Sequence, residues 1–155
     1  MSFDVTASQE VNAPPERVAA VEFDPARDPA WIGGVDTVEA LTPPPVTVGS
    51  RVRRLGGFMG RPIEWIMLVE AFEPDRLIAM RAEKSPFPMQ VDYVLEPLDG
   101  GRRTRASIRI RGAGGKGMYG LPGFLLGPMV RRSVAADLRR LRDIVERPDQ
   151  QGARS

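Results

Sequence analysis

The chain lacks both cysteine and histidine, with 0 Cys and 0 His in 155 residues. Without Cys it has no disulfide framework, thiol nucleophile or iron–sulfur site. Without His it has no Ser-His-Asp triad and no histidine metal site. A general base working near neutral pH would have to be an Asp or Glu with a strongly shifted pKa, and the sequence shows no sign of one. These absences favour binding over catalysis, leave enzymatic activity open, and predict neither a metal nor a cofactor.

Long apolar runs and aromatic-rich basic segments are also missing. No apolar stretch approaches the roughly 18 residues that span a membrane, so we expect no membrane span. No apolar leader segment follows Met1, and a cytoplasmic location is expected. The net charge is only +2, and the basic segment 102–111 contains no aromatic residue. Because nucleic-acid binding requires a basic surface with interleaved aromatic side chains, we expect no nucleic-acid partner.

Glycine and proline are abundant instead: 16 Gly and 15 Pro make up one fifth of the chain. They separate segments of alternating polarity, which are typical of half-buried strands. A strand is predicted over 3–11, a helix over 14–23, and a turn or short helix over 25–31. Further strands are predicted over 35–41, 51–55, 62–72, 76–83, 87–96 and 102–111. Consecutive strands joined by tight turns indicate an antiparallel meander.

The longest helical pattern follows the last strand. Its apolar stripe is formed by Val130, Val134, Leu138, Leu141 and Val145, and predicts a helix beginning near Pro128. A meander with one apolar face needs a cover, and only this helix is long enough to supply it. We therefore predict an α+β fold in which a curved, seven-stranded antiparallel sheet wraps around a long C-terminal helix. Two short helices lie between the first and second strands, and a cavity lies between sheet and helix. We expect residues 1–147 to form one domain, residues 148–155 to form a disordered tail, and the protein to be a monomer or homodimer.

Four segments in this order resemble the SRPBCC superfamily, which includes START domains, birch-pollen-allergen-like proteins and polyketide cyclase/dehydrase-like proteins. Segment 11–18 (VNAPPERV) is similar to the family's I-x-A-P-x-E-x-V entry into the first helix. Asp24-Pro25 followed by Trp31 resembles the D-P…W of the short helices. Segments 48–52 (VGSRV) and 69–77 (VEAFEPDRL) resemble its V-G-x-R and V-x-E-x-x-P-x-R-L motifs.

The resemblance implies the helix-grip fold and an internal cavity that holds an apolar or aromatic small molecule, such as a polyketide, lipid or related metabolite. Because one fold hosts many functions, it leaves two alternatives open. One is a polyketide cyclase or dehydratase acting on a polyketone. The other is a self-resistance protein that sequesters a reactive natural product, with the Gly-rich loop 112–117 as a sacrificial cleavage site.

Nine methionine and aromatic side chains are predicted to contact the ligand, because such residues form an adaptable, aromatic-lined pocket. Simple filling of the core remains the alternative for each. The set comprises Trp31, Trp65, Met67, Met80, Met89, Tyr93, Met118, Tyr119 and Met129.

Three polar residues complete the prediction. Tyr93 points to the apolar face of the sheet and needs a partner for its hydroxyl. The sequence pattern does not decide whether Arg54 and Arg81 point toward the cavity or toward solvent. In the polyketide cyclases of this superfamily, Arg and Tyr side chains orient a polyketone and stabilise enolates. If the protein is an enzyme, Tyr93, Arg54 and Arg81 are the catalytic candidates.

Overall fold

A computed structural model of the chain describes residues 2–58, 60–113 and 123–147. The first strand and the short helical segments come first in the chain: β1 (Ser2–Val11), α1 (Pro15–Glu22), the 3₁₀ turn η1 (Pro25–Arg27) and α2 (Asp28–Trp31). They are followed by β2 (Val35–Ala40), β3 (Arg51–Phe58), β4 (Arg61–Glu73), β5 (Leu77–Lys84), β6 (Met89–Leu98), the 3₁₀ turn η2 (Asp99–Gly101), β7 (Arg103–Ala113) and α3 (Gly123–Glu146).

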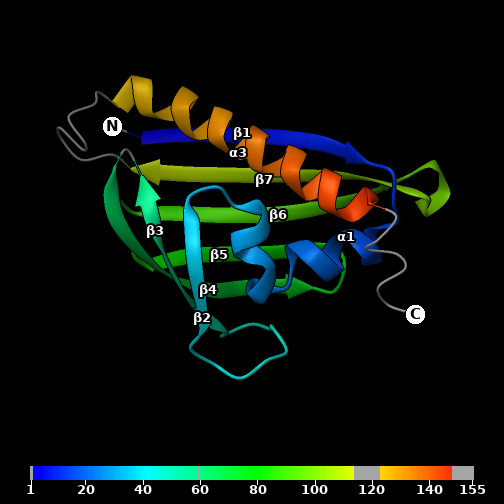
Figure 1. The fold of residues 1–155 in the computed structure, drawn as a ribbon, viewed down its shortest axis with the longest axis horizontal. Helices are drawn as coiled ribbons and strands as arrows, with labels where there is room; N and C mark the ends of the chain where they lie inside the picture. The colour runs from blue at the N-terminus through cyan, green and yellow to red at the C-terminus, as the bar shows by residue number, and fades with distance from the viewer. Residues whose placement is uncertain (1, 59, 114–122, 148–155) are drawn as a thin grey trace.

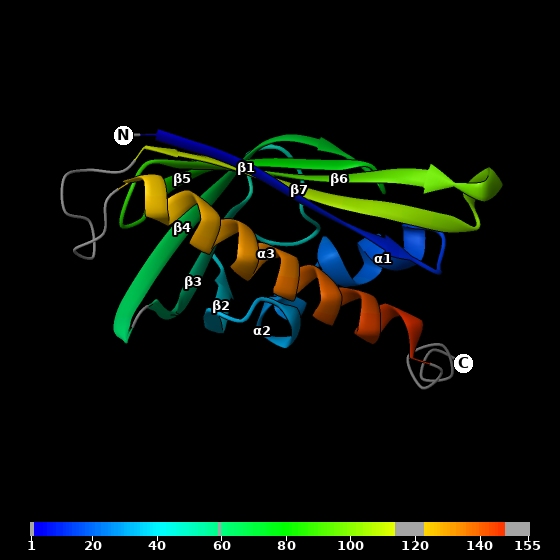
Figure 2. The ribbon, with the colours of Figure 1, turned by 90° about the horizontal axis from the view of Figure 1, so that it is seen from above.

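All seven strands form one antiparallel sheet in the order β1-β7-β6-β5-β4-β3-β2. The N-terminal strand pairs with the C-terminal one along its whole length, from Ser2 opposite Ala113 to Val11 opposite Thr104. Figure 1 shows α3 crossing the sheet, and Figure 2 shows that α1, α2 and α3 all lie on one side of it. In Figure 2, β3 and β4 curve toward this side, so the sheet grips α3. The predicted fold is confirmed. No helix in the described part of the chain is long and apolar enough to cross a membrane.

The start of α3 differs from the sequence prediction. The helix begins at Gly123 and contains Pro128, whereas the pattern predicted a helix starting near Pro128. Proline removes one backbone donor, here the N–H that would reach the carbonyl of Phe124. Phe124 is 67% exposed, so water can reach this carbonyl and the helix continues through the proline.

The core lies between the concave face of the sheet and the helices. The predicted stripe of α3 is its centre, with Leu138 and Leu141 fully buried. Val11 and Met67 face them from the sheet side and are also fully buried. Because apolar burial contributes about 25 cal/mol per Å², this layer dominates the stability of the fold.

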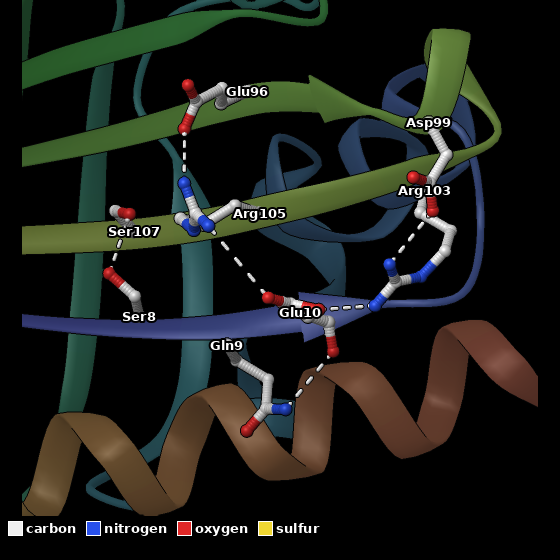
Figure 3. A network of polar contacts seen from close by, with 8 residues as sticks. All are labelled: Ser8, Gln9, Glu10, Glu96, Asp99, Arg103, Arg105 and Ser107. Carbon is white, nitrogen blue, oxygen red and sulfur yellow. Dashed lines mark hydrogen bonds and ion pairs between the residues drawn. The ribbon is translucent and has the colours of Figure 1, made fainter.

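The opposite face of the sheet carries ion pairs between neighbouring strands, as the alternation of Arg with Asp and Glu predicts. Arg109 donates two hydrogen bonds to Asp4, at 2.9 and 2.6 Å. Figure 3 shows the neighbouring network, in which Arg105 lies between Glu96 and Glu10. Exposed pairs of this kind contribute only about 0.2–1 kcal/mol each, so this face chiefly favours correct strand pairing.

One glycine is required by a close approach of two backbones. A Cβ placed on Gly56 of β3 would lie 1.8 Å from the carbonyl oxygen of Gly34. Gly34 immediately precedes β2, and its carbonyl accepts a hydrogen bond from the N–H of Gly57 at 3.1 Å. The turn between α2 and β2 is therefore pressed against β3, where it forms a wall of the cavity described next.

Candidate functional site

A cavity of about 160 Å³ lies between the concave face of the sheet and α3. Its walls come from five strands, the α2–β2 turn and α3, and most of them are apolar. Wall residues include Trp65, Met89, Val91, Ile108, Ile110 and Val130. Since a cavity of roughly 150 Å³ holds one benzene ring, the enclosed space matches a single aromatic ring. The wall also includes the buried Phe87 and the exposed Ser133, and a larger ligand would have to extend out of this space.

A buried ion pair forms the polar end of this cavity. Arg54 of β3 lines the cavity, and its Nε donates to Oδ2 of Asp28 at 2.8 Å. Asp28 is the first residue of α2 and is only 1% exposed. On its other side, the guanidinium of Arg54 donates to the hydroxyl oxygen of Tyr93 at 3.4 Å. Because this oxygen accepts from Arg54, the hydroxyl proton of Tyr93 remains available for a ligand.

The pKa shifts at this polar end keep Tyr93 and Arg54 protonated, so both side chains can donate hydrogen bonds. Burial raises the pKa of Tyr93 further than the charge of Arg54 lowers it, so the hydroxyl stays protonated near neutral pH. Burial acts to lower the pKa of Arg54, but Asp28 and Tyr93 outweigh it and the guanidinium stays charged. Burial also raises the pKa of Asp28, against the opposing effect of Arg54. A ligand oxygen at this end would therefore meet a cation and a neutral O–H donor.

Trp31 carries an unpaired donor next to this site. It ends α2, is 1% exposed and lines the cavity. Its indole packs edge-on against the ring of Tyr93, with centroids 5.8 Å apart. The indole N–H has no hydrogen-bond partner within the described residues. Buried polar groups are normally paired, so an unpaired donor is unusual at this depth.

Asp28 was not among the site residues predicted from the sequence. The family motif was placed at Asp24-Pro25, although Asp28-Pro29 stands closer to Trp31. In the structure Asp24 caps η1, accepting from the N–H of Ala26 at 3.1 Å. The second Asp-Pro pair was therefore the sequence signal that could have found the partner of Arg54.

Glu22, at the end of α1, was also missed. It is 1% exposed, and both carboxyl oxygens lack a hydrogen-bond partner in the described part of the chain. Burial, and secondarily the charge of Asp28, raise the pKa of Glu22 well above its ordinary value. Glu22 therefore keeps its proton to a higher pH than a free carboxyl group does. The sequence shows no sign of this shift, because it depends on the tertiary surroundings of the side chain.

Two polar residues of α3 hold the turn that carries Trp31. Asp137 accepts from the backbone N–H of Gly33 at 3.0 Å and also lines the cavity. Arg140 donates from Nε to the carbonyl oxygen of Trp31 at 3.0 Å and pairs with Asp137. Burial raises the pKa of Asp137 against the opposing hydrogen bond from Gly33 and charge of Arg140. Asp137 and Arg140 of the C-terminal helix thus hold the turn after Trp31 in place as a wall of the cavity.

The predicted ligand contacts divide into four groups. Trp31, Trp65, Met89 and Tyr93 line the cavity. Met67 and Met80 are buried in the core and lie outside the cavity wall, as the core-filling alternative allowed. Met129 is half-buried on α3 and also lies outside the wall. Met118 and Tyr119 lie outside the described residues, as does most of the Gly-rich loop 112–117.

The sequence left open which face of the sheet Arg54 and Arg81 occupy, and the structure places them on opposite faces. Arg54 lines the cavity. Arg81 lies on the outer face of the sheet, where its Nε donates to Glu70 at 3.0 Å and its side chain is 44% exposed. Arg81 therefore does not contact a ligand in this cavity, and the polar end consists of Arg54 and Tyr93.

The chain belongs to the family described as polyketide cyclase/dehydrase and lipid transport, whose model matches residues 2–146. A search of curated proteins finds no matching sequence.

Solved structures with the same fold accompany the family match. A protein from Thermus thermophilus is 21% identical, with a TM-score of 0.78 and coverage of 98% of this chain and 99% of its own. The Zhui aromatase/cyclase from Streptomyces sp. R1128 is 23% identical, with a TM-score of 0.78 and coverage of 98% of both chains. A START superfamily protein from Mycobacterium smegmatis is 19% identical, with a TM-score of 0.70, covering 92% of this chain and 94% of its own. At these identities the likeness establishes the fold alone.

Proposed function

We propose that the protein binds an apolar, aromatic small molecule with one oxygen acceptor, which enters the cavity with that oxygen toward Arg54. The observation that carries this proposal is the asymmetry of the cavity: apolar residues form most of its wall, and Arg54 and Tyr93, which are hydrogen-bonded to each other, place donors at one end. Few polar groups at fixed positions in an apolar pocket are typical of small-molecule sites. Family membership supports the same class of ligand, which includes polyketides and lipids.

The apolar part of the proposal is tested by filling the cavity. Val130 lines it from α3, so Val130→Trp should occupy the space of a ligand ring. The matched control is Val94→Trp, because Val94 is 41% exposed on β6 and does not line the cavity. The neutral fluorescent probe N-phenyl-1-naphthylamine should bind to the wild type and to Val94→Trp, and fail to bind to Val130→Trp. Equal binding by both variants contradicts the proposal.

The polar part is tested with two ligands that differ in one carbonyl group. Acetophenone and ethylbenzene each carry one aromatic ring, and each is titrated as a competitor of the fluorescent probe. Loss of one hydrogen bond costs about 0.5–1.5 kcal/mol, so Tyr93→Phe should weaken acetophenone about two- to tenfold and leave ethylbenzene unchanged. An equal effect on both ligands would show that the hydroxyl does not contact the ligand.

Cyclisation of a polyketone is the second candidate function. It is favoured by Asp137, whose carboxyl group lines the same cavity as Arg54 and Tyr93. Donors at one end would stabilise an enolate, and a carboxylate could take up a proton. Incubation with a linear poly-β-ketone thioester, followed by mass spectrometry, tests this activity. Tyr93→Phe should then reduce kcat far more than it weakens binding, and absence of any cyclised product leaves binding as the function.

A further inference from the structure

A second hollow lies outside the ligand cavity, at the junction of the short helices with the last turns of α3. We name it the arginine groove, and it has a volume of about 240 Å³. Figure 2 shows α2 beside the C-terminal half of α3, the two elements that form its sides together with η1. Its lining residues are Arg27, Ala30, Arg140, Asp143, Ile144 and Arg147.

From this groove we infer a binding site for a small oxyanion of the phosphate class. Its walls carry three guanidinium groups and one carboxylate. Planar guanidinium groups bind phosphate and carboxylate oxygens through pairs of parallel hydrogen bonds. Ile144, which is 7% exposed, and Ala30 supply an apolar floor that offers no competing hydrogen bonds.

Two carboxylates and the end of α3 oppose an anion at this groove: the carboxylates are Asp143 and Asp137, which pairs with Arg140. The carbonyl end of α3 contributes roughly half a negative charge. Asp143 contributes one more, but it also accepts two contacts from Arg142, at 3.1 and 3.0 Å. The guanidinium of Arg147 makes no hydrogen bond or ion pair with the residues that the structure describes, so its donors are available. The lining of the groove therefore holds more guanidinium groups than carboxylates, and the donors of Arg147 are unused by the described residues.

Arg140 joins this groove to the ligand cavity. It lines the groove, and its Nε holds the carbonyl oxygen of Trp31 at 3.0 Å. It also pairs with Asp137, and both Trp31 and Asp137 line the cavity. An oxyanion that draws on Arg140 competes with these contacts and loosens the turn that forms the cavity wall. Occupation of the groove should thus change the affinity of the cavity, and by linkage the reverse also holds.

The anion site itself is tested on ligand-free protein, so its outcome does not depend on the proposed function. Thermal unfolding is followed during titration with inorganic phosphate, with sodium chloride at matched ionic strength as reference. We expect a saturable rise in Tm with phosphate, and at least a roughly tenfold weaker apparent affinity in Arg147→Gln. The control is Arg132→Gln, an exposed α3 position outside the groove, which should respond like the wild type. Equal effects of chloride and phosphate, or equal loss in both variants, overturn the site.

Two sources of the same oxyanion are separated by a vesicle arm. Sedimentation is measured with phosphatidylcholine vesicles, with and without phosphatidic acid. A phosphate response without sedimentation identifies a free phosphate compound, and sedimentation that requires phosphatidic acid and Arg147 identifies a lipid headgroup. Either result supports the oxyanion site, and the absence of both responses overturns it.

The coupling to the cavity has its own measurement and rests on the proposed function. The affinity of N-phenyl-1-naphthylamine is measured with and without saturating phosphate. A change of several-fold in Kd, absent in Arg147→Gln, supports the coupling through Arg140. An unchanged Kd in a protein that binds both phosphate and probe overturns the coupling. A protein that binds phosphate but no probe contradicts the proposed function instead.

Discussion

Asp28 and Arg54 form an ion pair inside the protein, with Nε of Arg54 2.8 Å from Oδ2 of Asp28. One comes from the first turn of α2 and the other from β3, and the pair closes the polar end of the cavity. Burying two charged groups costs desolvation free energy, which their mutual attraction roughly offsets. Removing one partner leaves the other charge buried without compensation. The pair is therefore a positioning device for the donors of the cavity, and it contributes little net stability.

Breaking the pair on one side should be strongly destabilising. Asp28→Asn leaves the charge of Arg54 buried without a counter-ion, which we expect to cost about 3 kcal/mol of unfolding free energy. Asp36→Asn is the control, because Asp36 is exposed on β2. Urea denaturation of both variants at neutral pH provides the measurement. Similar stabilities of the two variants would show that Arg54 does not depend on Asp28.

Glu22 gives the protein a pH-dependent stability with a defined sign. Its pKa is raised in the folded state by burial and by Asp28, so the folded chain keeps a proton that the unfolded chain releases above pH 4.5. Stability contributed by this group is present below that pH and is lost as pH rises toward the folded-state pKa, by about 1.4 kcal/mol per pH unit. The raised pKa of Asp28 adds a contribution of the same sign.

Replacing Glu22 should remove its part of this dependence. We expect Glu22→Gln to be more stable than the wild type at pH 8 and about equal to it at pH 4, since Gln cannot ionise. Glu16→Gln, at an exposed position of the same helix, should follow the wild-type curve. Urea denaturation at several pH values checks both. A stability difference that does not vary with pH would contradict a buried neutral acid at position 22.

The close approach at Gly56 predicts a position that does not tolerate even alanine. Its added Cβ would lie 1.8 Å from the backbone oxygen of Gly34, so β3 and the α2–β2 turn must separate. We expect Gly56→Ala to lower the free energy of unfolding by about 3 kcal/mol or more, which is at the upper end of the range for overpacking. At Gly33, the added Cβ would meet the end of the flexible Arg140 side chain at 2.4 Å, and this group can swing away. Gly33→Ala should therefore be clearly milder in a thermal or urea melt; the reverse order would contradict the packing.

Thr104 anchors the connection between β1 and α1. It is fully buried, and its hydroxyl donates to the carbonyl oxygen of Ala13 at 2.7 Å. Thr104→Val leaves that carbonyl without its donor and should cost about 1–3 kcal/mol. Thr37→Val, at an exposed position of β2, should be nearly neutral. Equal unfolding free energies for the two variants would show that this hydrogen bond does not support the connection.

The order of elements could be predicted from the sequence because it depends on local patterns. The meander could be predicted because polar and apolar residues alternate along 3–11 and along the strands after Pro25. Gly and Pro residues mark the turns between these segments. The α3 stripe from Val130 to Val145 defined its cover. Tyr93 could be assigned to the inner face by the same alternation, and it is 4% exposed. These features need only a period of two or about 3.6 residues, which short segments carry by themselves.

Only the tertiary structure decided which polar groups meet. Arg54 shares the inner face of β3 with Val52, yet its burial depends on Asp28, which is 26 residues away. Arg81 lies outside because Met80 takes the inner position and Glu70 of the neighbouring strand supplies a partner. Glu22 lacks any such partner among the described residues, and burial raises its pKa. Sequence patterns determine which face a side chain takes, whereas its partner and protonation depend on distant segments that only folding brings together.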